Sequence, residues 1–358
     1  PARPEPLDPN DEVSCVATDR ALAGQRLAPR RPIFDWVGRR ELLGSRTIAL
    51  VPLLDVILGY DCNLACDYCT ITAEMRRREL PTERVARAMR EARAQGYDRV
   101  SFSGGEPTIR DDLIGLVRFA HQLGFGEIKV QSNGLVFARP ANLRRLVEAG
   151  ASAFHVSIHA HREEIYEAIV RRPGSYPLMV RGLSNLVAAG LDPCADIILM
   201  ESTYRDVGEA LGWLHALGVT RADLWFVSLT DGNRDNVATM PRITDVTPHV
   251  ADAFDVAGRL GMEVRSLHLP RCLLGPHAER AFDPARERVM VVTPDDVFEL
   301  SGSKLTPQVH VAACEGCPDR PRCRGLRPDY VERFGDTEVA EASGVVPSHP
   351  ATRLSVVS

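Results

Sequence analysis

The chain has 358 residues, a formal net charge of −5 and a hydrophobic share of 44%. This length suits one large domain with an appendage or two domains, and no overall excess of basic residues points to a nucleic-acid partner. The longest apolar run, near residues 48–58, is broken by Pro52 and Asp55 and is too short to cross a bilayer about 30 Å thick. The first residues lack an apolar signal segment, so we expect a cytoplasmic protein without nucleic-acid or membrane partners.

The first 48 residues are rich in Pro and Arg and predict an irregular extension. Strand-like and helix-like stretches then alternate over residues 49–267. Short runs rich in Val, Ile, Phe and Leu predict buried parallel strands at 53–58, 99–102, 127–131, 153–158, 195–200 and 222–227. Amphipathic stretches predict helices at 82–95, 111–123, 141–148, 176–189, 205–217 and 248–260. Six successive βα units fit either a partial (β/α)6 barrel or a doubly wound sheet, and the spacing does not choose between them.

The pattern changes after residue 267. Two strand-like runs at 288–292 and 297–300 flank a Thr-Pro-Asp-Asp turn and predict a hairpin. A cysteine-rich segment and a short helix-like stretch at 329–334 follow. We therefore expect a small C-terminal hairpin and cysteine-rich domain over 268–335 and a flexible tail over 336–358.

Seven of the nine cysteines fall into two groups: Cys62, Cys66 and Cys69, and then Cys272, Cys314, Cys317 and Cys323. Such spacings are typical of metal sites rather than of disulfides in an α/β protein. The first group directly follows the first predicted strand, where parallel folds place their chemistry. Three thiolates suit a [4Fe–4S] cluster, because one iron is left open to a small molecule. A zinc site or unliganded buried cysteines are the alternatives, although structural zinc prefers paired ligands.

A glycine-rich turn, Gly104-Gly105-Glu106-Pro107, follows the second predicted strand. Two glycines allow the backbone to approach a ligand closely, and Glu106 suits an ammonium group as a hydrogen-bond acceptor. Such a turn alone is weak evidence. Its position one βα unit after the cysteine motif indicates that the two motifs act together.

These motifs resemble those of the radical S-adenosylmethionine (SAM) superfamily over residues of about 50–267. The resemblance implies an α/β fold with a partial (β/α)6 TIM-like barrel, a [4Fe–4S] cluster on Cys62, Cys66 and Cys69, and bound SAM. The SAM-binding residues that it implies are Tyr68, Gly104, Gly105, Glu106, Ser132, Asn133, Ser157 and His159. The last four lie at the ends of the third and fourth strands, where a polar residue is as often a simple cap.

The resemblance also implies the reaction. A flavodoxin or ferredoxin supplies one electron, SAM is cleaved to methionine and a 5′-deoxyadenosyl radical, and the radical takes a hydrogen atom from the substrate. Candidates for the substrate site stand at strand ends: Glu201, Ser202, Ser228 and Asp231. Each also suits a cap or a solvated turn.

The second cysteine group has the spacing C-x41-C-x2-C-x5-C and resembles the twitch or SPASM appendage of radical SAM enzymes. The resemblance implies one auxiliary [4Fe–4S] cluster that four ligands close. A zinc site with four cysteines is the alternative. Cys272 is the weakest of these ligands, because it is remote from the others in the sequence.

We therefore expect a radical SAM enzyme for oxidation, cross-linking or epimerisation in a natural-product or peptide-modification pathway. Segments 172–176 and 182–186 resemble peptide-maturing relatives. Alternatives are a dehydrogenase or epimerase of a sugar or other small molecule, and a non-catalytic Fe–S electron carrier. Of the unassigned cysteines, Cys194 starts the fifth strand and is expected to be a core residue rather than a hydrogen-atom donor. The arginine run at 76–78 suits either an anionic partner or a solvated surface.

Overall fold

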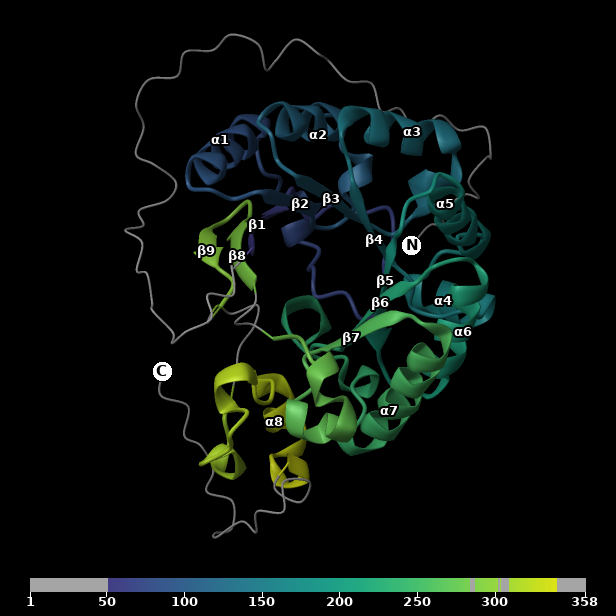
Figure 1. Cartoon of the computed structure of the whole chain (residues 1–358), viewed down its shortest axis with the longest axis vertical. Helices are drawn as coiled ribbons and strands as arrows, with labels where there is room; N and C mark the ends of the chain where they lie inside the picture. The colour runs from purple at the N-terminus through teal and green to yellow at the C-terminus, as the bar shows by residue number, and fades with distance from the viewer. Residues whose placement is uncertain (1–50, 284–286, 302, 304–308, 340–358) are drawn as a thin grey trace.

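The computed structural model describes residues 51–283, 287–301, 303 and 309–339. Seven parallel strands form its curved inner wall: β1 (Val51–Ile57), β2 (Arg99–Ser103), β3 (Glu127–Ser132), β4 (Ala153–Ser157), β5 (Cys194–Leu199), β6 (Arg221–Phe226) and β7 (Glu263–Leu267). The strands follow one another in chain order from β1 to β7. Figure 1 shows the arc that they make and the outer layer of helices around it.

The outer layer contains α1 (Thr82–Ala94), α2 (Leu113–Gln122), α3 (Pro140–Ala149), α4 (Glu163–Val170), α5 (Tyr176–Ala188), α6 (Val207–Ala216) and α7 (Ile243–Leu260). Each turns an apolar stripe toward the sheet. In α1, for example, Val85, Ala88, Met89 and Ala92 are buried at spacings of three and four residues. The six predicted strands and the six predicted helices are therefore confirmed, with shifts of a few residues, whereas α4 and β7 were not predicted.

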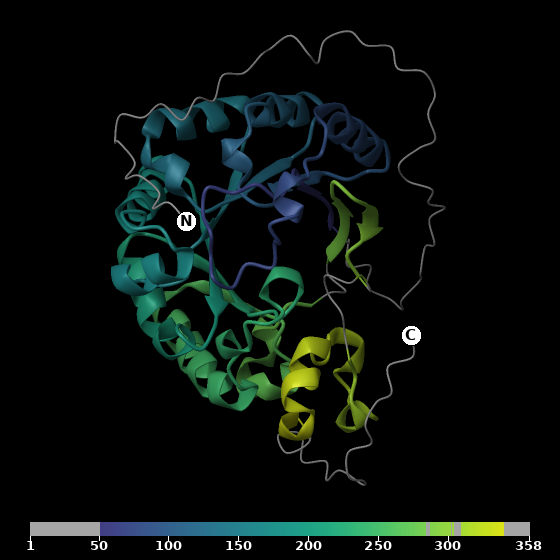
Figure 2. The same cartoon turned by 180° about the vertical axis from the view of Figure 1, so that it is seen from behind.

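The sheet is an open, partial barrel. Its described strands run in the order β7-β6-β5-β4-β3-β2-β1-β8-β9, so β7 and β9 stand at its two ends. The predicted hairpin, β8 (Glu287–Val292) and β9 (Val297–Glu299), is confirmed, and β8 pairs in parallel with β1. Residues that the sequence pattern assigned to the C-terminal domain therefore extend the barrel sheet, and the hairpin lies beside β1 in both views (Figures 1 and 2).

The C-terminal segment packs against the barrel through α8 (Pro328–Phe334). Tyr330 is buried there, and its hydroxyl accepts a hydrogen bond of 3.0 Å from the Ile243 amide and donates one to Glu338. Glu338 and Val339, which the sequence pattern placed in the tail, are buried. The predicted N-terminal extension, Cys15 and tail residues 340–358 lie outside the described residues. Over the described ranges, we find no helix with both the length and the apolar character needed to span a membrane.

Candidate active site

A cavity of about 580 Å³ opens at the carboxyl ends of the barrel strands. The residues predicted from the sequence that line it are Cys62, Cys66, Tyr68, Cys69, Gly104, Gly105, Ser132, Asn133, Ser157, His159, Ser228 and Asp231. They come from loops after β1, β2, β3, β4 and β6. The parallel strands thus bring residues that are up to about 170 positions apart in the chain to one edge of the sheet.

The three cysteines of the first group lie on the loop after β1, unpaired and half-buried. The C-terminal end of α4 holds this loop, because the carbonyls of Val170 and Ile169 accept the amides of Ala65 and Asp67 at 3.3 and 2.9 Å. Burial raises the pKa of the Cys62 thiol to about 11 and that of Cys66 to about 12, with a further rise from neighbouring thiolates. Both are therefore thiols at neutral pH until a metal displaces their protons.

The glycine turn after β2 packs tightly against this cysteine loop. The Gly105 and Glu106 amides donate to the carbonyls of Gly59 and Asp61 at 2.9 and 2.8 Å. A Cβ atom on Gly105 would lie 2.0 Å from the Asp61 oxygen, and one on Gly104 would lie 2.3 Å from the Gly59 oxygen. Glycine is therefore required for the approach of one loop to the other as well as for any approach to a ligand.

Glu106 belongs to the glycine turn and is almost fully buried. Its carboxylate accepts bonds from the Thr108 amide and hydroxyl at 3.0 and 2.6 Å, from the Ser132 hydroxyl at 2.9 Å and from the Asn133 amide at 2.7 Å. Four donors of the chain thus contact this carboxylate and join the glycine turn to the end of β3. The contact of Glu106 with an ammonium group stays a prediction.

The side chains of Ser132, Asn133, Tyr68 and His159 brace the cavity wall. Asn133 donates to the side-chain oxygen of Asn63 in the cysteine loop at 2.7 Å. The Tyr68 hydroxyl lies 2.8 Å from Nε2 of His159. Burial lowers the pKa of His159 to about 4, and its buried Nδ1 has no hydrogen-bond partner within the described chain. An orphaned nitrogen in this wall is the kind of group that a bound ligand satisfies.

Sequence reasoning missed Trp225 and His268, at the ends of β6 and β7, which form the far wall of the same cavity, and Phe298 of β9, which also lines it. His268 follows β7 directly and has a left-handed φ of 73°, unusual for a residue with a side chain. Its ring meets Trp225 edge-on at 5.4 Å, and its Nδ1 lies 3.3 Å from the Phe226 carbonyl. Burial, helped by the charge of Arg327, lowers the pKa of His268 to about 4. The neutral ring therefore donates through Nδ1 and keeps Nε2 as an acceptor.

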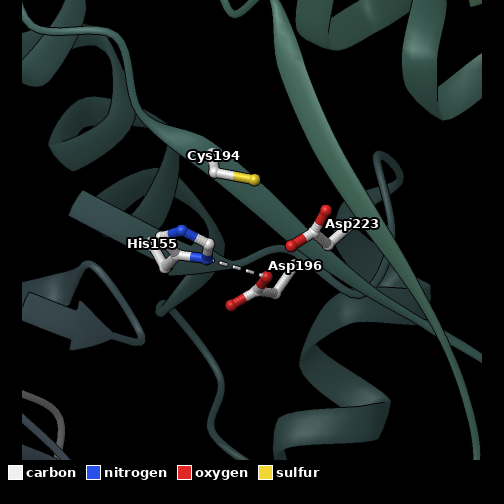
Figure 3. A group of neighbouring side chains, drawn as sticks. All are labelled: His155, Cys194, Asp196 and Asp223. Atoms are coloured by element: carbon white, nitrogen blue, oxygen red, sulfur yellow. Dashed lines mark hydrogen bonds and ion pairs between the residues drawn. The ribbon is translucent and has the colours of Figure 1, made fainter. Parts of the chain in front are cut away.

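The side chains of His155, Cys194, Asp196 and Asp223 gather on the adjacent strands β4, β5 and β6 and form what we call the polar floor (Figure 3). Asp196 accepts bonds from Gln131, His155 and Trp225 at 3.1, 3.2 and 3.2 Å, and so fixes two side chains that line the cavity, Gln131 and Trp225. Asp223 forms a two-point ion pair with Arg265 at 2.9 and 2.7 Å. Cys194 is 2% exposed and burial raises its thiol pKa. The expectation that Cys194 is a core residue agrees with this position.

Two of the substrate-site candidates lie outside the cavity. Glu201 is exposed and pairs with Arg205 at 2.7 Å, and Ser202 is exposed in a separate small pocket beside Asp206. Both stand beyond the end of β5, where the chain has already turned outward into the segment before α6. The sequence indicates only that Glu201 and Ser202 follow a strand, and this position does not fix the direction of a side chain.

The four cysteines of the second group line one small, mainly apolar pocket together with Ala313, Leu326 and Val339. Cys272 joins them although 41 residues separate it from Cys314. Burial, and then the charges of the other three thiolates, raise the pKa of Cys272 to about 11. The Gly325 amide donates to the Cys323 sulfur at 3.4 Å, as amides around Fe–S sulfurs do.

Among the described residues, His155, Cys194, Asp196 and Asp223 of the polar floor have ligand-type atoms that all lie within 4.8 Å of one another. The floor needs no ion, because Arg265 and the side chains of Gln131, His155 and Trp225 already contact its carboxylates.

A partial barrel with three cysteines after β1 and a Gly-Gly-Glu turn after β2, facing one cavity, defines the class of a radical SAM domain. Residues 56–219 match the model of the Radical SAM superfamily, so this part of the chain belongs to that superfamily. Members of the superfamily carry a [4Fe–4S] cluster and bind SAM.

Among curated proteins, the chain is 29% identical over 205 residues to a probable GTP 3′,8-cyclase of Methanothermobacter marburgensis, covering 56% of this chain and 65% of that protein. It is 28% identical over 207 residues to molybdenum cofactor biosynthesis protein 1 of Drosophila melanogaster, covering 56% and 32%. The chain thus spans less than two thirds of either relative. Among solved structures, SuiB of Streptococcus suis bound to S-adenosylmethionine has a TM-score of 0.60 at 14% identity, covering 79% of this chain and 74% of that one. This likeness shows the shared fold.

Proposed function

We propose that this chain is a radical SAM enzyme that oxidises a small molecule or a peptide residue in a natural-product or modification pathway. The observation that carries the proposal is the continuity of the cavity. Its near wall holds the cysteine loop and the glycine turn, and its far wall holds Trp225 and His268. One chamber therefore has room for SAM beside a substrate.

The bound cluster and SAM would supply a 5′-deoxyadenosyl radical that removes one hydrogen atom from the substrate. The chain's own residues would do the rest. Ser157 and the glycine turn would hold SAM, Trp225 would present an aromatic face, and Nε2 of His268 would accept a hydrogen bond from the substrate. Asp196 of the polar floor keeps Trp225 in place through a bond of 3.2 Å, and Trp225 in turn contacts the ring of His268.

Oxidation requires an acceptor for a second electron, and the second cysteine group lies close by. His268 lines the cavity and Cys272 lines the second pocket. A segment of four residues spans at most about 14 Å. An auxiliary cluster on Cys272, Cys314, Cys317 and Cys323 would therefore stand next to the substrate end of the cavity. Epimerisation has less support, because Cys194 is buried in the barrel floor.

The charges of the cavity favour a substrate other than a nucleoside triphosphate, the kind of substrate named for the archaeal relative. Of the described residues that line the cavity, the two arginines are already engaged: Arg78 pairs with Asp295 at 2.8 Å, and Arg76 binds backbone carbonyls. Asp231 and Asp296 add negative charge. A neutral or cationic substrate matches these walls better than a polyanion does.

The test is 5′-deoxyadenosine formation by protein reconstituted anaerobically with iron and sulfide and supplied with SAM and dithionite. Nucleoside from the wild type, and none from Cys69→Ala, is the expected result. Flavodoxin or ferredoxin, the proposed physiological reductant, would then replace dithionite. A protein that carries its full iron, binds no SAM and forms no nucleoside would instead support the electron-carrier alternative.

A further inference from the structure

Three consecutive carbonyl groups of the cysteine loop are bound by arginine side chains. Arg76 uses both ends of its guanidinium: Nη1 donates to the Cys62 carbonyl at 3.0 Å and Nη2 to the Leu64 carbonyl at 2.9 Å. Arg172 donates from Nη1 to the Asn63 carbonyl at 2.6 Å. Two side chains from different parts of the fold therefore hold three adjacent peptide groups.

The two arginines are placed for this contact. Arg76 lies in the short 3-10 helix Met75–Arg77 that follows the loop, and Arg172 lies just after α4, whose C-terminal end already holds the loop. Both are half-buried. The neighbouring Arg77 is exposed and donates only to the Ala73 carbonyl at 3.3 Å. The arginine run at 76–78 is thus not uniformly solvated, because Arg76 binds the cysteine loop while Arg77 is exposed.

The contacts have two physical consequences for the cysteines. The guanidinium groups bind three adjacent carbonyls and so fix the backbone of the loop, in which the Leu64 amide donates to Cys62 Sγ at 3.4 Å. The two positive charges also contact the carbonyl of Cys62 itself and those of the two residues that follow it. Reduction of a metal site adds one negative charge, which a nearby cation stabilises more than it stabilises the oxidised form.

We propose that Arg76 and Arg172 are positioning residues that fix the cysteine loop and favour the reduced state of the cluster bound to it. The inference rests on the proposed function, because it requires a [4Fe–4S] cluster on Cys62, Cys66 and Cys69. By this proposal, Arg76 and Arg172 help the first cluster to accept the electron that starts the reaction. Lysine cannot replace Arg76 fully, because an ammonium group does not span two carbonyls as the planar guanidinium does.

The experiment is a redox titration of the whole reconstituted protein, followed by electron paramagnetic resonance. The signal of the first cluster is recognised by its change when SAM is added. We expect Arg76→Gln and Arg172→Gln each to lower the ratio of reduced to oxidised cluster about tenfold at a fixed potential, equivalent to about 59 mV for one electron. The matched control Arg77→Gln, one residue along the chain, should leave the ratio unchanged.

The variant Arg76→Lys separates charge from hydrogen bonding, because it keeps the positive charge but cannot bind both carbonyls. We expect its midpoint to lie between those of wild type and Arg76→Gln. If Arg76→Gln loses iron from the first site while the second cluster stays, the loop-fixing role is supported, and Arg76→Lys and Arg172→Gln still report the potential. Potentials of both glutamine variants equal to that of Arg77→Gln would overturn the proposal. Failure of the proposed function is separate, since the wild type itself would then show no SAM-responsive signal.

Discussion

The two cysteine groups of this chain differ in what surrounds them. The first has three cysteines on one loop, lines a cavity of about 580 Å³ and is held by hydrogen bonds from Arg76, Asn133 and Arg172. The second has four cysteines that gather in a small, mainly apolar pocket. This difference matches the roles that we propose: the first group adjoins a chamber for ligands, and the second, with one more cysteine, would hold a closed cluster for electron transfer.

The largest expected effect comes from removing one ligand from each group in turn. Cys69→Ala should lower 5′-deoxyadenosine formation about 1,000-fold or more, to background, because the cluster that cleaves SAM is lost. Cys317→Ala should keep SAM cleavage and lose about half of the bound iron. Iron analysis and nucleoside chromatography measure both. Cys194→Ala is the matched control and should change neither nucleoside formation nor iron content. Equal loss of nucleoside in Cys69→Ala and Cys317→Ala would contradict the expected difference between the two cysteine groups.

A second contrast uses the glycine beside each group. A Cβ atom on Gly105 would lie 2.0 Å from the Asp61 oxygen, and one on Gly325 would lie 2.4 Å from the Val309 oxygen. Each alanine variant should therefore cost about 2–4 kcal/mol of stability through forced backbone movement. Gly105→Ala should impair the first site alone and Gly325→Ala the second alone, as measured by denaturant unfolding and iron content.

Two other glycines provide controls for that contrast. Gly316 shares the positive φ of Gly325, at 74° against 67°, but a Cβ atom there meets nothing within 4 Å. Gly316→Ala should thus cost only about 1–2 kcal/mol, from backbone strain alone. Gly212, inside α6 with open space around it, should tolerate alanine or gain about 0.5–1 kcal/mol. Equal destabilisation by Gly316→Ala and Gly325→Ala would show that steric contact is not the cause.

Acidic pH should lower the free energy of unfolding through His268, which lines the cavity beside the first cysteine group. The pKa of His268 is about 4 in the folded chain, and it returns to about 6.5 on unfolding, so the unfolded state binds the extra proton. The stabilisation is complete above pH 6.5 and is lost as the pH falls toward 4, by about 2 kcal/mol between pH 7 and pH 5. The charged groups that face the ring are Arg324, Arg327 and Asp329.

The free energy of unfolding of metal-free protein is measured in urea at pH 7 and at pH 5. The same two measurements are made on the His268→Phe variant. The phenylalanine keeps the aromatic contact with Trp225 and cannot titrate. The pH dependence should therefore be about 2 kcal/mol smaller in the variant. An identical pH dependence in both proteins would mean that the histidine is not buried in its neutral form.

The smallest effects separate residues inside the cavity from those outside it. Ser157 lines the cavity, and Ser157→Ala should weaken SAM binding about 5- to 10-fold through one lost hydrogen bond. Glu201→Gln breaks an ion pair whose side chains are 47% and 54% exposed, so it should change stability by less than about 0.5 kcal/mol and leave SAM binding intact. Equilibrium binding of SAM to the reconstituted protein measures both; weaker binding in Glu201→Gln would place that residue back at the site.

Much of the fold was predictable because buried parallel strands are short apolar runs between amphipathic helices. The two missed elements have physical reasons. β7 has the sequence Glu-Val-Arg-Ser-Leu, whose charged residues hide the apolar run expected of a buried strand. Arg265 can lie in this strand because it pairs with Asp223 of the polar floor. α4 has only 8 residues, too few for a clear period. The hairpin was predicted as a hairpin, but its parallel pairing with β1 depends on contacts more than 200 residues apart.

The site was predictable where motifs mark it and not elsewhere. The cysteines and the Gly-Gly-Glu turn have fixed spacings, and the structure brings them to one cavity. Trp225 and His268 belong to no motif, and only the meeting of β6 and β7 makes them neighbours. The direction of a side chain was also beyond reach: Glu201 turns to the surface and pairs with Arg205.

The parallel pairing of β1 with β8 sets a limit on how this protein can be dissected. A fragment ending at residue 267 would contain every residue of the family match and would still lack β8, one of the two strands that pair with β1. The strand that leads into the cysteine loop would then become an exposed edge, with unpaired amides and carbonyls and with Leu53 and Ile57 uncovered. Such edges recruit other chains, so the excised fragment should aggregate, and the smallest unit that folds by itself includes the hairpin.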